Sequence, residues 1–381
     1  MKNIVIASDS FKGSLTSMEV SDAAEIGIRN VFPQCNVIKV NVADGGEGTV
    51  EVIVKALGGN IHTATVTDPL GRPINATYGI VEQKGVKTAV IEMSAASGLP
   101  HLLPEERNPL ITSTYGTGLL ILHALTQGCR KFLIGIGGSA TNDAGTGMLS
   151  ALGVKFFDSS GKLLKGSGSD LEYIAKIDVS SLLPEVKASE FIVACDVDTP
   201  FCGPEGAAHV FAPQKGATPQ MVDILDRGMF SFAKRIAATF NTNIIPIDGA
   251  GAAGGLGGTF KVFLNAHLTK GIEMVLNVIS FDSIIRDADL VITGEGRVDF
   301  QTAKGKTAAG VLEHTKKAGI PTIVIGGSVE MCPALKNMGF AGIYPIINTP
   351  VSLEKAMQKD FANANISRTI EQVLTTIKHF R

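Results

Sequence analysis

The chain has 381 residues, of which 43 are glycine, a share of about 11% against roughly 7% in average proteins. Hydrophobic residues make up 45% and charged residues 18%, with 34 basic and 36 acidic side chains. This hydrophobic share excludes an intrinsically disordered chain, and the near-neutral charge argues against a nucleic-acid-binding groove. No uncharged apolar stretch of about 18 residues occurs, so we expect no membrane span and a cytoplasmic protein.

Short β-branched runs alternate with helix-like segments along the whole chain. Most runs are apolar without polar alternation, which is typical of strands buried on both faces in parallel sheets. The expected strands are residues 3–7, 37–42, 88–92, 131–136, 191–195, 290–293 and 322–325. The first expected helix opens with a capping box at Thr16 and Glu19 and ends before Pro33. The other expected helices are residues 49–57, 116–126, 143–152, 220–239 and 302–317. The alternation predicts an α/β fold with parallel sheets.

Both ends of the chain carry strand–helix units, which favours one lobe built from both termini with the middle of the chain inserted into it. We place the crossings near residues 69–73 and 277–286. The predicted lobes are therefore residues 1–72 with 286–381, and residues 73–285.

Two polar, glycine-containing loops follow the first two expected strands. The first brings Asp9, Ser10 and Lys12, a set that suits a charged substrate, although an ordinary polar turn with a structural Asp9 explains it equally well. The second brings Asp44 and Glu47, which could hold a metal ion or a substrate hydroxyl. N-capping of the following helix by Asp44 is the alternative, and it explains only one of these two acids.

A third glycine-rich loop, residues 135–145, follows the strand at 131–136. Gly135, Gly137 and Ala140 match the dinucleotide-binding fingerprint, and Asp158 follows at roughly the expected offset. This pattern supports a rival interpretation of the chain as a nicotinamide-dependent oxidoreductase. Four polar residues make the loop more polar than a dinucleotide turn requires, namely Ser139, Thr141, Asn142 and Asp143.

Charged side chains also gather after the expected strand at 290–293. Glu295, Arg297, Asp299 and Lys306 form a set suited to phosphate and metal, with a solvated, salt-bridged turn as the alternative. A P-loop is excluded because Phe300 stands where the motif requires glycine.

Asp196 and Asp198 follow the strand at 191–195 and alternate, so in an extended chain both point to one face. Paired carboxylates of this kind can bind Mg²⁺ or divide acid and base roles. Residues 249–258 contain six glycines and three alanines, from which we expect a nucleotide-contacting loop or a hinge rather than a packed helix. The histidines and the five cysteines show no zinc-binding spacing, and we expect free thiols.

Seven blocks, in order, resemble the bacterial glycerate kinase family, of the type that includes 2-phosphoglycerate-forming enzymes. The blocks are residues 9–15 (DSFKGSL), 43–49 (ADGGEGT), 107–109 with 112–118, 135–143 (GIGGSATND), 194–216, 249–257 and 294–306. Thr199 and Ala212 depart from the pattern, where Asn and Gly are usual.

The resemblance implies transfer of the ATP γ-phosphoryl group to D-glycerate with Mg²⁺, and we favour the 2-phospho product over the 3-phospho product. It also implies two α/β lobes around a cleft, with a Rossmann- or flavodoxin-like lobe formed by both termini. The expected partner is a small-molecule substrate rather than a nucleic acid or a membrane, and the expected enzyme is a monomer or homodimer.

Phosphoryl transfer requires charge neutralisation and a proton acceptor, and the glycerate carboxylate suits a bidentate arginine, for which Arg297 is the first choice. The expected catalytic residues are Asp196, which is the preferred base, Asp299 and Lys12. The expected substrate-binding residues are Ser10, Asp44, Arg72, Arg107, Arg297 and Glu295. The expected ATP-binding residues are Gly137, Gly138, Ser139, Thr141, Gly251, Gly254, Gly255 and Lys306, and the expected Mg²⁺ ligands are Asp196 and Asp198. A non-enzymatic small-molecule receptor stays open beside the oxidoreductase as an alternative.

Overall fold

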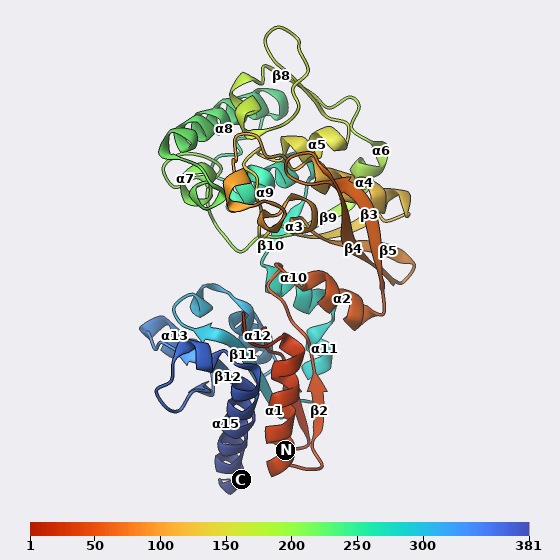
Figure 1. Cartoon of the computed structure of the whole chain (residues 1–381). Helices are drawn as coiled ribbons and strands as arrows, with labels where there is room; N and C mark the ends of the chain where they lie inside the picture. The colour runs from red at the N-terminus through yellow and green to blue at the C-terminus, as the bar shows by residue number, and fades with distance from the viewer. Residues whose placement is uncertain (381) are drawn as a thin grey trace. The chain divides into compact units, whose positions relative to one another are not determined.

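The computed structural model describes residues 1–380, which pack as two units (Figure 1). Unit 1 combines Met1–Asp44 with the chain from Val275 onward, and unit 2 is Gly45–Met274. Among the described residues, no helix is both long and apolar enough to cross a bilayer. All five cysteines are free thiols.

Unit 1 is built on a five-stranded parallel sheet with the order β13-β12-β11-β1-β2. The strands are β1 (Asn3–Ile6), β2 (Asn36–Lys39), β11 (Leu290–Val298), β12 (Thr322–Val329) and β13 (Gly342–Pro345). Ile4 pairs with Leu290 and Ile6 with Ile292, and all four side chains are buried, as the apolar runs predict. Numbered by their order within unit 1, the strands are arranged 2-1-3-4-5, which is the flavodoxin-like order.

Helices cover both faces of this sheet. Thr16 and Glu19 form the predicted capping box at the start of α1 (Ser17–Val31), which ends before Pro33. α1 lies beside α15 (Lys359–His379), and the two approach so closely that a Cβ on Gly27 would lie 2.3 Å from the carbonyl oxygen of Ser367 (Figure 1). The other helical elements of unit 1 are α11 (Phe281–Ile285), η5 (Thr302–Lys304), α12 (Thr307–Lys317), α13 (Pro333–Asn337) and α14 (Leu353–Ala356).

Unit 2 is built on a six-stranded sheet with the order β10-β9-β6-β5-β4-β3. The strands are β3 (Asn60–Thr67), β4 (Pro73–Gln83), β5 (Val86–Glu92), β6 (Lys131–Gly135), β9 (Glu190–Ala194) and β10 (His267–Thr269). From β5 to β10 neighbouring strands are parallel, whereas β4 is antiparallel to both of its neighbours. The β3–β4 hairpin is absent from the predicted strands because it carries no continuous apolar run.

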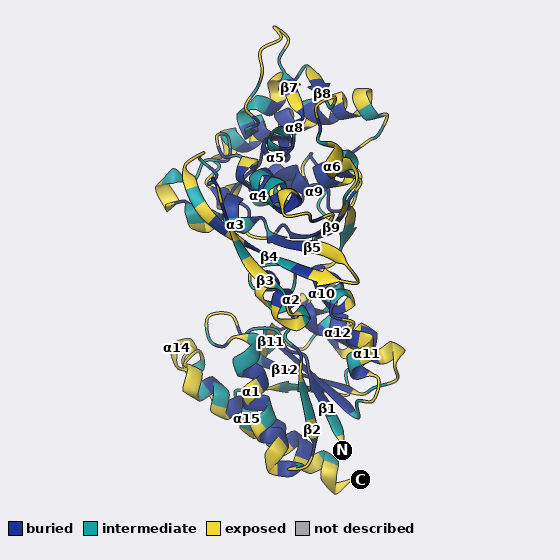
Figure 2. Cartoon of the chain, turned by 90° about the vertical axis from the view of Figure 1, so that its right-hand side faces the viewer, coloured by how far each residue is buried: buried dark blue, intermediate teal, exposed yellow. Residues whose placement is uncertain are grey.

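The helices of unit 2 pack on this sheet around a core in which the rings of Phe132 and Phe191 stack with their centroids 4.8 Å apart. Figure 2 shows the helices and strands in dark blue where they face the cores and in yellow on their outer surfaces. The α-helices are α2 (Thr49–Leu57), α3 (Ser94–Ser97), α4 (Tyr115–Thr126), α5 (Thr146–Ala151), α6 (Pro184–Lys187), α7 (Ala207–Phe211), α8 (Pro219–Phe240) and α9 (Ala252–Leu264), and α10 (Gly271–Val278) passes from unit 2 to unit 1. The remaining short elements are η1 (Leu99–His101), η2 (Pro104–Glu106), η3 (Gly168–Tyr173), η4 (Pro213–Lys215) and the hairpin of β7 (Lys155–Phe157) with β8 (Lys176–Asp178).

The two units agree with the expected α/β class and with a lobe built from both ends of the chain. The predicted boundaries, residues 1–72 with 286–381 and residues 73–285, stay a prediction. The packing units divide the chain earlier, at Asp44 and Met274, because β3 pairs with β4 and because α2 packs on β4, where Gly79 meets Val54.

The glycine-rich segment 249–258 differs from its prediction as a loop or hinge, because most of it is the buried first half of helix α9. Ala253, Gly254 and Gly255 have φ angles of 52°, 71° and 94°, so the helix contains a left-handed kink. A Cβ on Gly254 would lie 2.2 Å from the carbonyl oxygen of Thr141. The glycines therefore allow α9 to pack directly on the backbone of the loop that follows β6.

We expect Gly254→Ala to lower the free energy of unfolding by at least ~2 kcal/mol, because the new Cβ adds a clash to a left-handed backbone. Gly58→Ala is the matched control, since Gly58 has a similar φ of 68° and nothing within 4 Å of its Cβ position. We expect this control to cost about 1 kcal/mol. Urea unfolding of both variants measures the difference, and equal costs would contradict the packing role.

Candidate active site

The carboxyl ends of β1 and β11 form the point in unit 1 where the strand order reverses. In open α/β sheets, ligands bind at this switch point. Asp9 follows β1, and its backbone N–H donates to the carbonyl of Gly294 in β11 at 2.9 Å. Glu295 and Arg297 lie inside β11, not in a loop after residue 293, because β11 continues its pairing with β12 as far as Val298.

Glu295 is the most strongly perturbed acid at this point. Its side chain is 6% exposed and accepts a hydrogen bond from the hydroxyl of Thr302. Burial raises the pKa of Glu295 to about 7, Asp9 and Asp299 act in the same direction, and Thr302 and Lys306 oppose the shift. A carboxyl group with this pKa is able to take up or release a proton near neutral pH.

Asp9 lies in the same group of acids and is held by two hydrogen bonds. Its Oδ1 accepts from the backbone N–H of Ser10 at 2.7 Å, and its Oδ2 accepts from the hydroxyl of Thr307 at 2.9 Å. Burial, followed by the nearby charge of Asp44, raises the pKa of Asp9. The ammonium of Lys12 lies 3.6 Å from Asp44 and is largely exposed. Unit 1 thus brings together the predicted Ser10, Lys12 and Asp44, with Asp9 among them.

Arg297 is flanked by two carboxylates. Its Nε lies 3.0 Å from Oδ2 of Asp299, and an Nη donates to Glu330 at 2.7 Å. Asp299 is buried, and its Oδ1 also accepts the backbone N–H of Gln301 at 2.8 Å, so both of its oxygens are engaged. Lys306 is exposed and donates to the side-chain oxygen of Gln301 at 2.8 Å. A substrate carboxylate that binds Arg297 would compete with the exposed Glu330.

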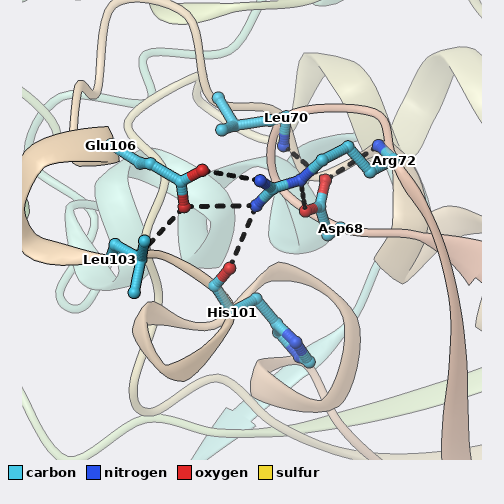
Figure 3. A network of polar contacts seen from close by, with 6 residues as sticks. All are labelled: Asp68, Leu70, Arg72, His101, Leu103 and Glu106. Carbon is cyan, nitrogen blue, oxygen red and sulfur yellow. Dashed lines mark hydrogen bonds and ion pairs between the residues drawn. The ribbon is translucent and has the colours of Figure 1, made fainter.

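Arg72, by contrast, is committed to a network inside unit 2 (Figure 3). Its Nε donates to the buried Asp68 at 2.5 Å, one Nη donates to Glu106 at 2.6 Å, and the other donates to the carbonyl of His101 at 3.2 Å. These contacts join the turn between β3 and β4 to the segment around η2. The structure therefore favours a structural role for Arg72 over the predicted contact with substrate.

We expect Arg72→Lys to lower the melting temperature while leaving the KM for D-glycerate, the substrate that the sequence resemblance implies, within about twofold of the wild-type value. A lysine ammonium cannot span Asp68 and Glu106 with the planar fork of a guanidinium. Arg297→Lys is the matched variant, for which we expect a raised KM and little change in melting temperature. A large rise in KM for Arg72→Lys without loss of thermal stability would restore Arg72 as a substrate ligand.

The loop that links Asp44 to α2 lies at the carboxyl edge of the second sheet. A Cβ on Gly45 would lie 2.5 Å from Cβ of Ala194, and one on Gly135 would lie 2.2 Å from the carbonyl oxygen of Gly45. The backbone N–H of Val50 in the first turn of α2 donates to Glu92 at 2.9 Å. The N-cap position is Gly48, so the alternative of N-capping by Asp44 is wrong, and Glu92 serves this end of the helix.

The loop at residues 135–145, named the glycine loop below, is held by two charged residues. Asp143 is fully buried, and accepts hydrogen bonds from the backbone N–H and the hydroxyl of Thr114 at 2.7 and 2.8 Å. Burial raises the pKa of Asp143. Lys215, which the sequence did not single out, donates to the hydroxyl of Ser139 at 2.8 Å and to the carbonyl of Thr141 at 2.6 Å.

The dinucleotide-binding interpretation fails on the geometry around Asp158. β7, which precedes it, pairs antiparallel with β8 and is not a strand of the parallel sheet. The Oδ1 of Asp158 accepts the backbone N–H groups of Ser160 and Lys162 at 2.8 and 3.0 Å, which makes it a turn residue. The glycine loop therefore lacks the acid that would bind the ribose of a dinucleotide.

Asp196 and Asp198 follow β9 and are exposed, whereas Cys195 and Val197 are partly buried, which agrees with the predicted alternation. Oδ1 of Asp196 accepts the backbone N–H of Gly271 at 2.9 Å. Within residues 1–380, no group of three or more His, Cys, Asp and Glu residues is arranged to hold a metal ion. Mg²⁺ needs only one or two carboxylates beside phosphate oxygens and waters, so the Asp196 and Asp198 pair fits its donor preference.

Comparison with known proteins gives a consistent result. The sequence profile of the Glycerate kinase family matches residues 4–378. The chain is 46% identical to a glycerate kinase of Bacillus subtilis over 377 residues, covering 98% of this chain and 97% of the relative. It is 42% identical to a glycerate 2-kinase of Escherichia coli over 375 residues, again covering 98% and 97% of the two chains.

A solved structure extends this similarity to the fold. A crystal structure assigned as a glycerate kinase 2 from Salmonella typhimurium LT2 superposes with a TM-score of 0.88 at 44% sequence identity. The match covers 99% of this chain and 98% of that chain.

Proposed function

The chain belongs to the glycerate kinase family, and from this premise we propose that it transfers the γ-phosphoryl group of ATP to a hydroxyl of D-glycerate with Mg²⁺. We favour 2-phosphoglycerate as the product. The glycerate oxygen attacks the γ-phosphorus, the bond from that phosphorus to the ADP oxygen breaks, and the hydroxyl proton passes to a carboxylate.

The observation that carries this proposal is the group of acids at the switch point of unit 1. Asp9 and Glu295 are both held by hydroxyl donors, and the pKa of each is raised by burial. Lys12 and Lys306 are near the same acids and are exposed, so they are able to reach an anionic ligand. Phosphoryl transfer requires a proton-accepting acid with cations beside it, whereas binding alone does not need a carboxylate of raised pKa.

We assign the proton-accepting role to Glu295 and keep Asp196 as the alternative base. Glu295 is favoured because its pKa of about 7 matches neutral operating conditions. Asp299 is less suited than the sequence suggests, since both of its oxygens are already engaged by Arg297 and Gln301. Arg297 stays the first candidate for the glycerate carboxylate.

We assign Mg²⁺ to Asp196 and Asp198, two carboxylates of the kind this ion takes beside phosphate oxygens. The bound ion would neutralise the charge of the transferring phosphates. For the ATP phosphates themselves, we propose the glycine loop at Gly137, Gly138, Ser139 and Thr141. Gly138 has a φ of 73°, so this part of the loop turns in a way that suits backbone N–H groups directed at an anion. Gly254 and Gly255 support that loop by close packing against Thr141 and Ala144, whereas Gly251 packs against the backbone of Thr199 and Pro200.

A direct assay tests the proposal. The protein is incubated with ATP, Mg²⁺ and D-glycerate, and the products are identified by phosphorus and proton NMR. We expect ADP and 2-phosphoglycerate in equal amounts. Formation of 3-phosphoglycerate would correct the position of transfer, and absence of any phosphoglycerate would reject the proposed function.

A further inference from the structure

Lys215 is a buried cation without a counter-ion. It is 1% exposed, and its ammonium donates to two neutral acceptors, the hydroxyl of Ser139 and the carbonyl of Thr141. None of the ion pairs within residues 1–380 includes Lys215, and the nearby Asp143 acts on it only as a more distant charge. An ammonium has three N–H donors, so one of them lacks a partner.

Such an arrangement is unfavourable for the folded chain by itself. Removal of an ammonium from water costs several kcal/mol, and hydrogen bonds to neutral acceptors offset only part of this desolvation free energy. Burial accordingly lowers the pKa of Lys215 to about 7. A methionine would fill a similar volume at this position without the cost of burying a charge. The ammonium of Lys215 is therefore not explained by the stability of the fold.

Arg107 is a second cation with an unused donor in the same part of unit 2. Its Nε is buried and has no hydrogen-bond partner among the described residues. The backbone of Arg107 packs against Gly216, the neighbour of Lys215, so closely that a Cβ on Gly216 would lie 2.3 Å from the Arg107 carbonyl oxygen. Gly216 also has a φ of 89°, a conformation that favours glycine.

The glycine loop adds a third unsatisfied group. Thr141 is fully buried, and its hydroxyl has no hydrogen-bond partner among the described residues, although its carbonyl accepts from Lys215. Thr112 ties the chain just after Arg107 to the same loop, because its hydroxyl donates to the carbonyl of Ala140 at 3.0 Å. Two cations and a hydroxyl therefore each have unused hydrogen-bonding capacity within one packed segment of unit 2.

We propose that Lys215, Arg107 and Thr141 form a binding site for an oxyanion. An anionic oxygen would accept the unused hydrogen bonds and would supply the negative charge that Lys215 lacks. The inference rests on the proposed function for the identity of the ligand, which is either the carboxylate of glycerate or a phosphate of ATP. Both present the same chemistry to the site, and the kinetics below distinguish them.

The test compares Lys215→Met with Lys234→Met, the same substitution on the exposed surface of α8. KM is measured for D-glycerate at saturating ATP and for ATP at saturating D-glycerate, with melting temperatures measured in parallel. We expect Lys215→Met to raise the KM of one substrate at least about tenfold while its melting temperature is unchanged or raised. A raised KM for D-glycerate identifies the carboxylate, and a raised KM for ATP identifies the phosphate. The control is expected to change neither constant.

A purely structural lysine gives the opposite pattern, in which melting temperature falls and both KM values stay within about twofold of wild type, and this result would overturn the proposal. If Lys215→Met does not fold, Arg107→Gln carries the same test, with the same expected rise in one KM and the same overturning result. If the wild-type protein does not phosphorylate glycerate, the proposed function fails separately. The site is then tested with inorganic phosphate, which must stabilise the wild type against heat more than it stabilises Lys215→Met. Equal stabilisation overturns the site.

Discussion

Replacement of Asp196 by asparagine is expected to lower kcat by about 10³-fold or more, because the transferring phosphates lose a carboxylate that holds Mg²⁺. Asparagine has nearly the same shape, and its side-chain oxygen is able to accept the hydrogen bond that Gly271 donates to Oδ1 of Asp196. We therefore expect the melting temperature to stay unchanged. Steady-state kinetics with varied ATP, D-glycerate and Mg²⁺ measure the effect.

The Mg²⁺ dependence separates the two roles considered for Asp196. If it holds the ion, Asp196→Asn raises the Mg²⁺ concentration needed for half-maximal rate, and Asp198→Asn does the same to a smaller or equal degree. If Asp196 is instead the base, the rate falls at every Mg²⁺ concentration, and the Mg²⁺ concentration needed for half-maximal rate does not change. Near-normal turnover of Asp196→Asn would reject both roles.

The sequence predicts the parallel strands well because their apolar runs have one physical cause, burial on both faces. β1, β6 and β9 each fall within one residue of the expected bounds, and α2 matches them. The β3–β4 hairpin has a different cause, since alternate side chains of its outer strand face water, and a search for continuous apolar runs misses it. Helix α15 was also missed, because its apolar face is interrupted by polar residues and becomes visible only against α1.

The acids of the site are predictable for a related reason. Residues directly after a parallel strand lie at one edge of the sheet, so Asp9, Asp44 and Asp196 stand out once the strands are known. Lys215 does not follow a strand, and it reaches the glycine loop from a position 76 residues further along the chain. Only the packed structure shows that contact, and the same is true of the Thr114 hydroxyl on Asp143.

Arg72 and the glycines of α9 show a limit of the sequence pattern. Both were expected to touch a ligand, the glycines as part of a block shared with a kinase family and Arg72 as a candidate for the substrate carboxylate. Arg72 instead binds Asp68 and Glu106, and Gly254 instead allows backbone contact with Thr141. A sequence pattern cannot distinguish a residue that contacts a ligand from one that supports the contacting loop, because both roles constrain the residue type.

Glu295→Gln is expected to lower kcat by about 100-fold and to remove the rise of kcat with pH that an ionising base produces near pH 7. Glutamine keeps an oxygen that accepts the hydrogen bond of Thr302, but it cannot take a proton from the substrate hydroxyl. The measurement is the pH profile of kcat for both proteins between pH 5 and 9. A retained rise near pH 7 in the variant would assign the proton acceptor to another residue, with Asp196 as the first alternative.

The same substitution has a stability effect of predictable sign. The pKa of Glu295 is raised from 4.5 to about 7 in the folded state, so between these values the folded chain holds a proton that the unfolded chain has lost. The wild-type free energy of unfolding therefore decreases as pH rises from 4.5 to 7, by up to about 3 kcal/mol from this group. Glutamine does not titrate, so Glu295→Gln should gain stability relative to wild type over this interval.

Urea unfolding of both proteins at pH 5 and pH 8 measures the gain, and because all other groups are shared, their contributions cancel in the comparison. If the free energy of unfolding changes equally with pH in both proteins, the pKa of Glu295 is not raised in the folded state. The assignment of Glu295 as proton acceptor would then lose its physical basis.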